Sequence, residues 1–192
     1  MLYIIRHGET EGNCAQILQG QMQGQLTPHG QQQAIDAGAR IQVQMADAQI
    51  APLHAIIASD LKRTVDTAQL INRALHLPLH TTPLLRERDW GELTGLPYHQ
   101  VRGREELPAS VESLEAMTAR LHAFFAQLEA NWAGQNLLLV THGYTARLMQ
   151  ALALNCSPRD IAPMQNVELR PLHPPTIAAP STRPDEVGAT DS

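Results

Sequence analysis

The chain has few cysteines and almost no lysine. Its two cysteines, Cys14 and Cys156, are too few for a disulfide framework and do not have the spacing of metal ligands. Of the 14 basic residues only Lys62 is a lysine. We interpret this as a compositional bias, because a role of arginine in binding phosphate must be argued position by position.

An excess of positive charge and long apolar runs are also lacking. The net charge of −5 and the pI near 6.0 argue against a general nucleic-acid binder. No apolar run approaches the roughly 18 residues of a membrane helix, and residues 2–5 are too few for the core of a signal peptide. We expect a cytoplasmic protein with no nucleic-acid or membrane partner. Its oligomeric state stays open, with a homodimer as one candidate.

The length of 192 residues fits a single domain. A domain of this size buries roughly 70% of its unfolded surface and needs neither disulfides nor metals for stability. Residues 171–192 contain five prolines and show no apolar periodicity. We therefore expect a catalytic domain over residues 1–170 and a disordered tail over residues 171–192.

Short continuous apolar runs alternate with helical patterns. Such runs predict strands buried on both faces of a parallel sheet; they cover residues 2–5, 55–58 and 137–140, with further strands expected at 78–82 and 165–169. Thr27 and Pro28 predict a helix start, and apolar stripes predict two more helices over 61–75 and 111–132. This alternation predicts an α/β fold, a three-layer sandwich whose mostly parallel central sheet carries helices on both faces.

Charged and imidazole side chains follow the ends of three predicted strands. Arg6 and His7 follow the first strand, Arg63 lies in the first helical turn after the second, and His142 and Gly143 follow the third. Ligands of open α/β sheets bind at the carboxyl ends of the strands, and helix N-termini there favour anions. Two arginines and two histidines at one sheet edge predict a site for a dianion such as a phosphoryl group.

The segments around these residues resemble the histidine phosphatase superfamily, in its phosphoglycerate-mutase-like branch. An isolated Arg-His-Gly would be weak support, but several blocks occur here in the family's order and span residues 3 to about 169. The blocks are Arg6–Asn13, Gly20 with Leu26–Ala34, Ser59–Ala68, Leu85–Glu92 and Val140–Gly143.

The resemblance implies that His7 is the nucleophile, which attacks phosphorus and becomes phosphorylated. Imidazole is a good nucleophile when neutral, and neighbouring cations lower its pKa. Its other ring nitrogen needs a fixed acceptor, which we expect to be a backbone carbonyl in the turn at Gly8. The resemblance also implies contacts to the phosphoryl group; they come from Arg6, Asn13, Arg63, His142 and Gly143. Asn13 has the alternative role of closing a turn.

By the same resemblance, Glu87 is the general acid that protonates the leaving oxygen and then activates water. Asp89 and Glu92 lie nearby, and sequence alone does not place a loop side chain. No cluster of metal ligands is present, so we expect neither a metal nor a cofactor.

The chain departs from the family pattern in three places. Residues 23–25, Gln-Gly-Gln, stand where relatives often have Asp-x-Pro, and we expect this to change a loop rim and not the phosphate clamp. The tail is expected to replace the last strand that many relatives have after Leu169. Between Trp90 and Ser110 the chain lacks the larger basic insertion with which phosphoglycerate mutases hold a second charged group, which favours a phosphatase.

The leading hypothesis is a phosphatase of small phosphorylated metabolites. The alternatives are a mutase, a phosphohistidine or phosphotyrosine protein phosphatase, and a catalytically silent protein that senses an anion. A sensor does not need a nucleophile and an acid together, so the presence of His7 and Glu87 counts against the last one. By resemblance the substrates include sugar phosphates, phosphoglycerates, alpha-ribazole phosphate and fructose bisphosphates.

Overall fold

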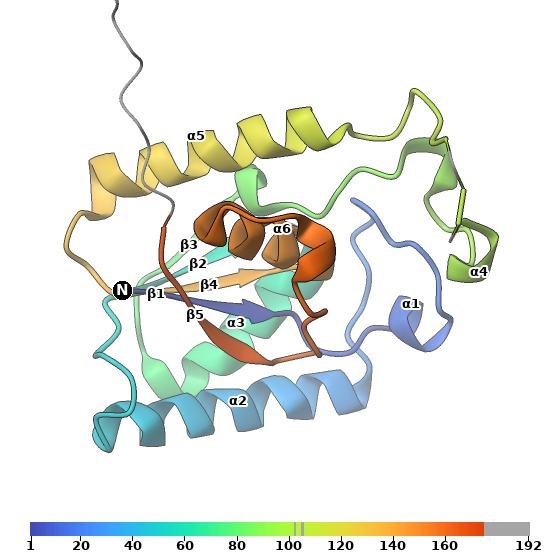
Figure 1. Ribbon diagram of the computed structural model, residues 1–192. Helices are drawn as coiled ribbons and strands as arrows, with labels where there is room; N and C mark the ends of the chain where they lie inside the picture. Colours follow the sequence, from blue (N-terminus) through green and yellow to red (C-terminus); the bar gives the residue numbers. More distant parts are fainter. Residues whose placement is uncertain (102, 105, 175–192) are drawn as a thin grey trace, which may run out of the picture.

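The computed structural model describes residues 1–101, 103–104 and 106–174. Its centre is a five-stranded sheet with the order β3-β2-β4-β1-β5 (Figure 1). The strands are β1 (Leu2–Arg6), β2 (Ala55–Ser59), β3 (Leu79–Thr82), β4 (Leu137–Thr141) and β5 (Leu169–Leu172). The first four are parallel and β5 runs antiparallel to β1, so the sheet is mostly parallel as predicted.

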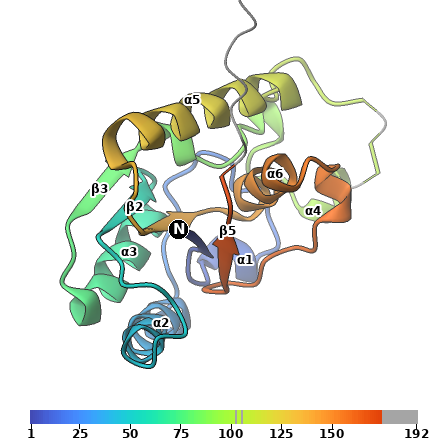
Figure 2. The same ribbon diagram turned by 60° about the vertical axis from the view of Figure 1, so that its left-hand side comes forward.

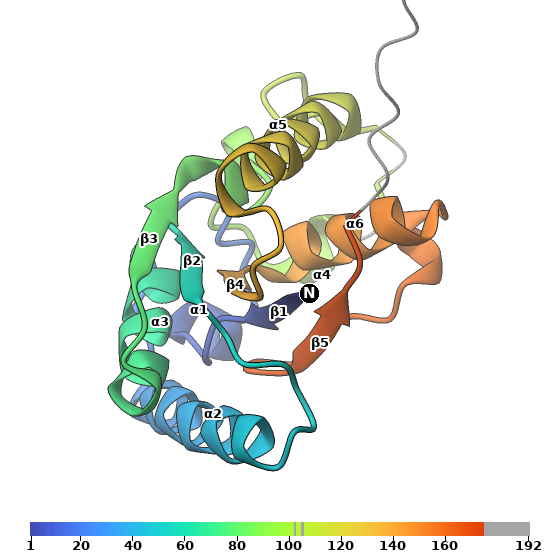
Figure 3. The ribbon, with the colours of Figure 1, turned by 90° about the vertical axis from the view of Figure 1, so that its left-hand side faces the viewer.

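Helices cover both faces of this sheet. They are α1 (Glu11–Cys14), α2 (Pro28–Ala46), α3 (Lys62–Leu75), α4 (Tyr98–Val101), α5 (Leu114–Trp132) and α6 (Gly143–Leu154). Viewed along the strands, α2 and α3 lie on one face and α5 and α6 on the other (Figures 2 and 3). The predicted three-layer sandwich is confirmed. In the described part of the chain, no helix has the length and apolarity to cross a membrane.

The strands are continuously apolar because both faces of the sheet are buried. In β1, Leu2 and Ile4 pack into the core beneath α5 and α6, whereas Tyr3 and Ile5 pack into the core beneath α2 and α3. All five residues of β4, at the centre of the sheet, are buried. The core is therefore two apolar layers, one on each side of a single sheet.

The predicted helix starts are partly right. The Thr27 side chain accepts a hydrogen bond from the backbone of Gly30 at 2.9 Å, which caps α2 where the sequence predicted. The helix expected from residue 111 begins only at Leu114, because Ser113 is its N-cap. Val111 instead packs with Leu18, Leu93 and Val101 in a small separate cluster.

The last strand differs from the prediction. The strand expected at residues 165–169 lies at Leu169–Leu172, where Leu172 pairs with Leu2 and is only 2% exposed. Pro171 is tolerated because β5 is an edge strand, in which a missing N–H can face away from the sheet. The expectation that the tail replaces the last strand is therefore wrong, since β5 runs across residue 170. Residues 175–192 of the predicted tail lie outside the described residues.

Candidate active site

Neighbouring strands bring the two histidines together. β1 and β4 are paired with Arg6 opposite Thr141, so His7 and His142 follow adjacent strand ends. The His7 amide donates to the Thr141 carbonyl at 3.0 Å, and the two imidazole centroids are 5.4 Å apart. β2 lies on the other side of β4 and ends at Ser59, whose hydroxyl oxygen is 2.9 Å from His142 Nε2. The strand ends converge as the sequence predicted.

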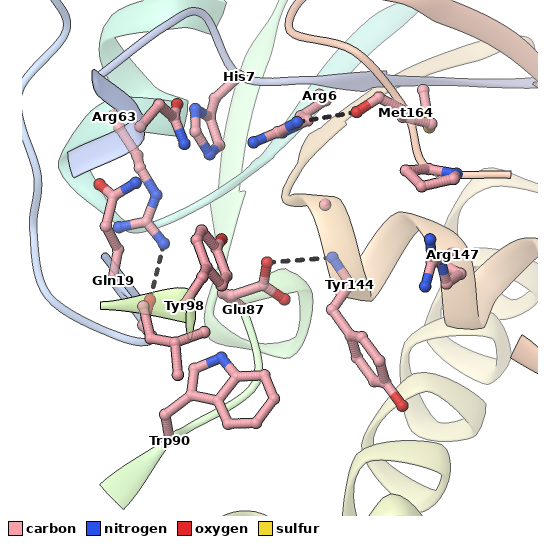
Figure 4. A pocket seen from close by; sticks show the side chains of 15 residues that line it. Arg6, His7, Gln19, Arg63, Glu87, Trp90, Tyr98, Tyr144, Arg147 and Met164 are labelled. Carbon is pink, nitrogen blue, oxygen red and sulfur yellow. Dashed lines mark hydrogen bonds between the residues drawn. The ribbon is translucent and has the colours of Figure 1, made fainter. Parts of the chain in front are cut away.

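A cavity of about 290 Å³ opens at this edge of the sheet (Figure 4). Six of the seven residues proposed for the site from sequence line it, namely Arg6, His7, Asn13, Arg63, Glu87 and Gly143. The seventh, His142, is fully buried and does not line the cavity.

His7 is oriented by the turn that follows it. Its Nδ1 lies 2.7 Å from the Gly8 carbonyl oxygen, as expected. Because a carbonyl only accepts, Nδ1 carries the hydrogen and the lone pair of a neutral ring is on Nε2. The His7 side chain is 3% exposed, and its burial lowers the pKa well below its ordinary value, with Arg63 and then Arg6 adding to the effect. The imidazole is therefore neutral at pH 7.

Two further hydrogen bonds hold the backbone of this turn. The Gly8 amide donates to Thr67 Oγ1 at 3.0 Å, and Asn166 Nδ2 donates to the His7 carbonyl at 2.8 Å. A Cβ at position 8 would lie 2.5 Å from the Gly30 carbonyl oxygen, which is closer than atoms can approach. A glycine at this position thus lets the nucleophile turn pack directly on the start of α2.

Arg6 lines the cavity and has one buried donor without a partner among the described residues. Its Nη1 donates to the Met164 carbonyl at 2.8 Å, while its buried Nε has no hydrogen-bond partner within the described part of the chain (Figure 4). A Cβ at Gly143 would lie only 3.5 Å from this Nε. An unpaired buried N–H is costly unless a ligand accepts from it, and a phosphoryl oxygen is a suitable acceptor.

Arg63 is 1% exposed and is held by three of its five N–H groups. Nε donates to His142 Nδ1 at 3.1 Å, Nη2 donates to the Gly20 carbonyl at 2.7 Å, and Nη1 donates to the Met22 carbonyl. Burial lowers the pKa of Arg63 to about 10, opposed by the charge of Glu87. Arg63 thus remains a cation at pH 7, with two N–H groups left for a ligand.

His142 lies behind Arg63 and His7, away from the cavity wall. Its Nδ1 accepts from Arg63, so its Nε2 carries the hydrogen that points to Ser59. Burial, followed by the Arg63 charge, lowers the pKa of His142 well below its ordinary value. In this arrangement both ring nitrogens contact protein groups, and the neutral ring orients the Arg63 guanidinium.

Asn13 closes a turn at the edge of the cavity. Its Oδ1 accepts from the Thr10 amide at 3.1 Å and from Asn166 Nδ2 at 3.3 Å, and Thr10 Oγ1 accepts from the Asn13 amide. These contacts form the capping box of α1. The residue closes a turn and also lines the cavity.

Glu87 lies against the N-terminus of α6. Its Oε2 accepts from the Tyr144 amide and its Oε1 accepts from the amide and the hydroxyl of Thr145, each at 3.1 Å. Oε1 also accepts from the Arg88 amide at 2.9 Å. A carboxylate is favourable at the positive end of a helix. These contacts hold the carboxyl group at the cavity wall.

The two other acidic residues of this segment are turned elsewhere. Asp89 accepts from the Gly91 amide at 2.8 Å, and Glu92 lies 3.2 Å from the Ser110 hydroxyl. Neither lines the cavity. Among the three acids that the sequence left open, Glu87 alone is in position to reach a ligand there.

The loop that departs from the family pattern contacts the clamp directly. The Gln23 carbonyl accepts from the Arg63 amide at 3.3 Å, and Gln23 Oε1 accepts from the Lys62 amide at 3.0 Å. These bonds cap the start of α3, which has no cap from its own N-cap residue Leu61. The loop that contains the departure therefore lies beside the backbone of Arg63 as well as at the rim of the cavity.

One wall of the cavity was not predicted. It contains Trp90, Tyr98, Tyr144 and Arg147, and three of these are among only seven aromatic residues of the chain. Arg88 stacks behind this wall, with its guanidinium carbon 4.9 Å from the Trp90 ring centroid and 5.4 Å from that of Tyr144. Because aromatic residues are so scarce in this chain, Trp90 could have been singled out from the sequence as a candidate site residue. Arg147 follows Gly143 by one helical turn, which also places it on the same helix face.

Known proteins match this chain along most of its length. Residues 2–173 match the family described as the histidine phosphatase superfamily (branch 1). The chain is 32% identical over 142 residues to the uncharacterized phosphatase PhoE of Bacillus subtilis, covering 73% of this chain and 70% of that protein. It is 33% identical over 156 residues to the probable phosphoglycerate mutase GpmB of Klebsiella pneumoniae, covering 74% and 69%.

A solved structure with a similar fold is a mycobacterial glucosyl-3-phosphoglycerate phosphatase in complex with VO3. It has a TM-score of 0.75 and 26% sequence identity, and the match covers 88% of each chain. Family match, sequence identity and fold agree with one another and with the arrangement of His7 between two arginines. The chain belongs to the histidine phosphatase superfamily, branch 1.

Proposed function

We propose that the protein hydrolyses phosphate monoesters of small metabolites in two steps, through a phosphohistidine on His7. The observation that carries this proposal is the His7 imidazole itself. It is neutral, its Nδ1–H is fixed by the Gly8 carbonyl, and its lone pair on Nε2 lies beside Arg6 and Arg63. This is the arrangement of an activated nitrogen nucleophile next to an anion site.

In the first step Nε2 of His7 attacks phosphorus and the bond from phosphorus to the leaving oxygen breaks. The free Nε–H of Arg6 and the two free N–H groups of Arg63 bind the phosphoryl oxygens as their charge shifts. The reacting form of the enzyme has Glu87 protonated; Glu87 gives this proton to the leaving oxygen, and the alcohol departs. His142 holds the Arg63 guanidinium in position, and Asn13 completes the phosphoryl site.

In the second step water attacks the phosphorus of phosphohistidine. The Glu87 carboxylate takes a proton from this water, the bond between Nε2 and phosphorus breaks, and inorganic phosphate leaves. His7 is again neutral and Glu87 is again protonated, so the cycle closes without a metal or a cofactor.

The size of the cavity supports a small substrate. Its volume of about 290 Å³ is at the lower end of the range for small-molecule sites. This favours a metabolite over a phosphoprotein loop. A mutase is the second candidate, since relatives 33% identical are named probable phosphoglycerate mutases; it would return the phosphoryl group to an organic acceptor in place of water.

A panel of phosphate monoesters tests the proposal, with released phosphate and isomerised product measured separately. We expect phosphate release from alkyl phosphates, no isomerisation, and no turnover by His7→Ala. Isomerisation faster than phosphate release would establish the mutase. Turnover by His7→Ala equal to that of the parent would rule out both reactions at this site.

We further propose a cytoplasmic location and a homodimer. The first is tested by cell fractionation, and the second by light scattering across a range of protein concentrations.

A further inference from the structure

A third arginine lines the cavity, away from the nucleophile. Arg147 lies on α6 four residues after Gly143, or about 6 Å along the helix axis. Gly143, Tyr144 and Arg147 all line the cavity, so one face of α6 forms part of its wall. Figure 4 shows Arg147 beyond Tyr144, on the opposite side of Glu87 from Arg63.

Among the arginines that the structure describes, Arg147 is the one that is half-buried and has no bound partner. Among the arginines that the structure describes, three have no side-chain hydrogen bond or ion pair; they are Arg73, Arg147 and Arg159. Arg73 and Arg159 are exposed and need none, because water solvates them. A half-buried guanidinium facing a cavity has an unused capacity for an anion.

The neighbours of Arg147 in the cavity strengthen this capacity. Pro163, Met164 and Tyr144 line the cavity with it and present mostly apolar surface. Apolar surroundings lower the effective dielectric constant, so an ion pair formed there is stronger than one in open water. Glu87, the acid that lines the same cavity, is bound by the amides at the start of α6 and not by Arg147.

We propose that the substrate carries a second anionic group, a carboxylate or a second phosphate, and that Arg147 binds it. This rests on the proposed function, because the first anion is the phosphoryl group held by Arg6 and Arg63. Among the described residues that line the cavity, the cations are Arg6, Arg63 and Arg147, and only Arg147 lies outside the phosphoryl site. The charge for the distal group of the substrate therefore comes from α6, and the preferred substrates are small phosphate esters with two anionic groups.

Two substrates that differ in one group test this inference. 3-Phosphoglycerate and glycerol 3-phosphate share the phosphoryl ester and the adjacent hydroxyl, and differ in a carboxylate against a hydroxymethyl group. Fructose 1,6-bisphosphate and fructose 6-phosphate form the corresponding pair for a second phosphate. We measure kcat/KM for the parent, Arg147→Gln and Arg147→Lys, with Arg73→Gln as the control that removes an equal charge outside the cavity.

In one of the two pairs, we expect the parent to prefer the member that carries the second anionic group. Arg147→Gln should lower kcat/KM for that member about 10-fold, mainly through KM, and change the matched ester less than about 2-fold. Arg147→Lys should recover part of the loss, and Arg73→Gln should behave as the parent. Which pair responds identifies the second group as a carboxylate or a phosphate.

Equal effects on both members of each pair, or no effect, would overturn the inference while leaving the hydrolysis intact. Failure of the proposed function is distinguished by the parent itself, which would then release no phosphate from any of the four esters. In that event calorimetric binding of the same four compounds to the parent and to Arg147→Gln decides the matter. A loss of affinity in Arg147→Gln that is confined to the member with the second anionic group supports the second-anion site. Affinities that are identical in the parent and in Arg147→Gln reject it.

Discussion

The two sides of the cavity are built in different ways. Arg6, His7 and Arg63 come from strand ends or from the first turn of a helix, and each is held by backbone carbonyls. The opposite wall comes from the loop after β3 and from α6, and its side chains are half-buried or exposed, as for Tyr98 and Arg147. The comparison teaches that the side proposed to bind the phosphoryl group is held in place by the sheet, whereas the side proposed to contact the organic part is built from a loop and one helix.

The largest expected effect is the loss of hydrolysis rate in a Glu87 variant, and it should depend on the leaving group. We expect Glu87→Gln to lower hydrolysis of alkyl phosphates by about 10²–10⁴-fold, the usual contribution of a general acid. Phosphorylation of the enzyme by an activated aryl phosphate should fall much less, because a phenolate with electron-withdrawing substituents leaves without a proton. Single-turnover kinetics over esters of different leaving-group pKa measure this, and the variant should show the steeper dependence.

Asp89→Asn is the matched control, since Asp89 lies in the same loop but outside the cavity. It should leave the leaving-group dependence unchanged. Equal losses on alkyl and activated aryl esters in Glu87→Gln would assign Glu87 to binding or folding.

The next effect is on stability and concerns the strand beside β1. Truncation after Arg170 removes Pro171 and Leu172 from β5, and Leu172 is buried against the core. We expect a loss of about 2–5 kcal/mol in the free energy of unfolding, typical for removing a buried leucine. Truncation after Pro174 keeps the strand and should leave stability and turnover near those of the full chain. Urea unfolding of the two truncated chains measures the difference, and equal stabilities would show that β5 contributes nothing.

A smaller effect is the dependence of stability on pH. Folding lowers the pKa of both His7 and His142 below the value of about 6.5 in the unfolded chain. Between about pH 6.5 and 5 the unfolded chain therefore binds more protons, and stability falls as the pH decreases, by at most about 1.4 kcal/mol per pH unit for each ring. Urea unfolding over this window should show the slope, and His142→Asn should reduce it. His122→Gln, at an exposed position on α5, should leave it unchanged. A stability that is constant across the window would refute the buried neutral rings.

The smallest expected effect is that of a chelator. The positive charge at the phosphoryl site comes from Arg6 and Arg63, so we expect turnover to be unchanged by excess EDTA within measurement error. Loss of turnover with EDTA and its return with added magnesium would show that a metal is required.

The sequence predicted the side of the site that the sheet builds. Continuous apolar runs located the ends of β1, β2 and β4, and a parallel sheet places such ends at one edge, so Arg6, His7 and Arg63 could be brought together without coordinates. Even the Gly8 carbonyl as partner of His7 Nδ1 followed from the need to fix the ring.

The opposite wall could not be predicted in the same way. Tyr98 reaches the cavity because its segment pairs with the loop at Ile17, a long-range contact with no local pattern. The orientation of His142 depends on its contacts with Arg63 and Ser59, which the sequence does not reveal. Likewise β5 lies further along the chain than the predicted strand at residues 165–169, because an antiparallel edge strand tolerates Pro171.

The central claim, a phosphoryl group carried by His7, is tested most directly by rapid quench of a single turnover with a phosphate-labelled ester. Quenching in base preserves a phosphoramidate, and peptide mass spectrometry locates it. The account predicts a base-stable, acid-labile phosphoryl group on His7 that forms and decays within one turnover, is absent in His7→Ala, and accumulates in Glu87→Gln with an activated aryl ester. Full turnover with no phosphohistidine at any time, or a phosphoryl group on another residue, would contradict it.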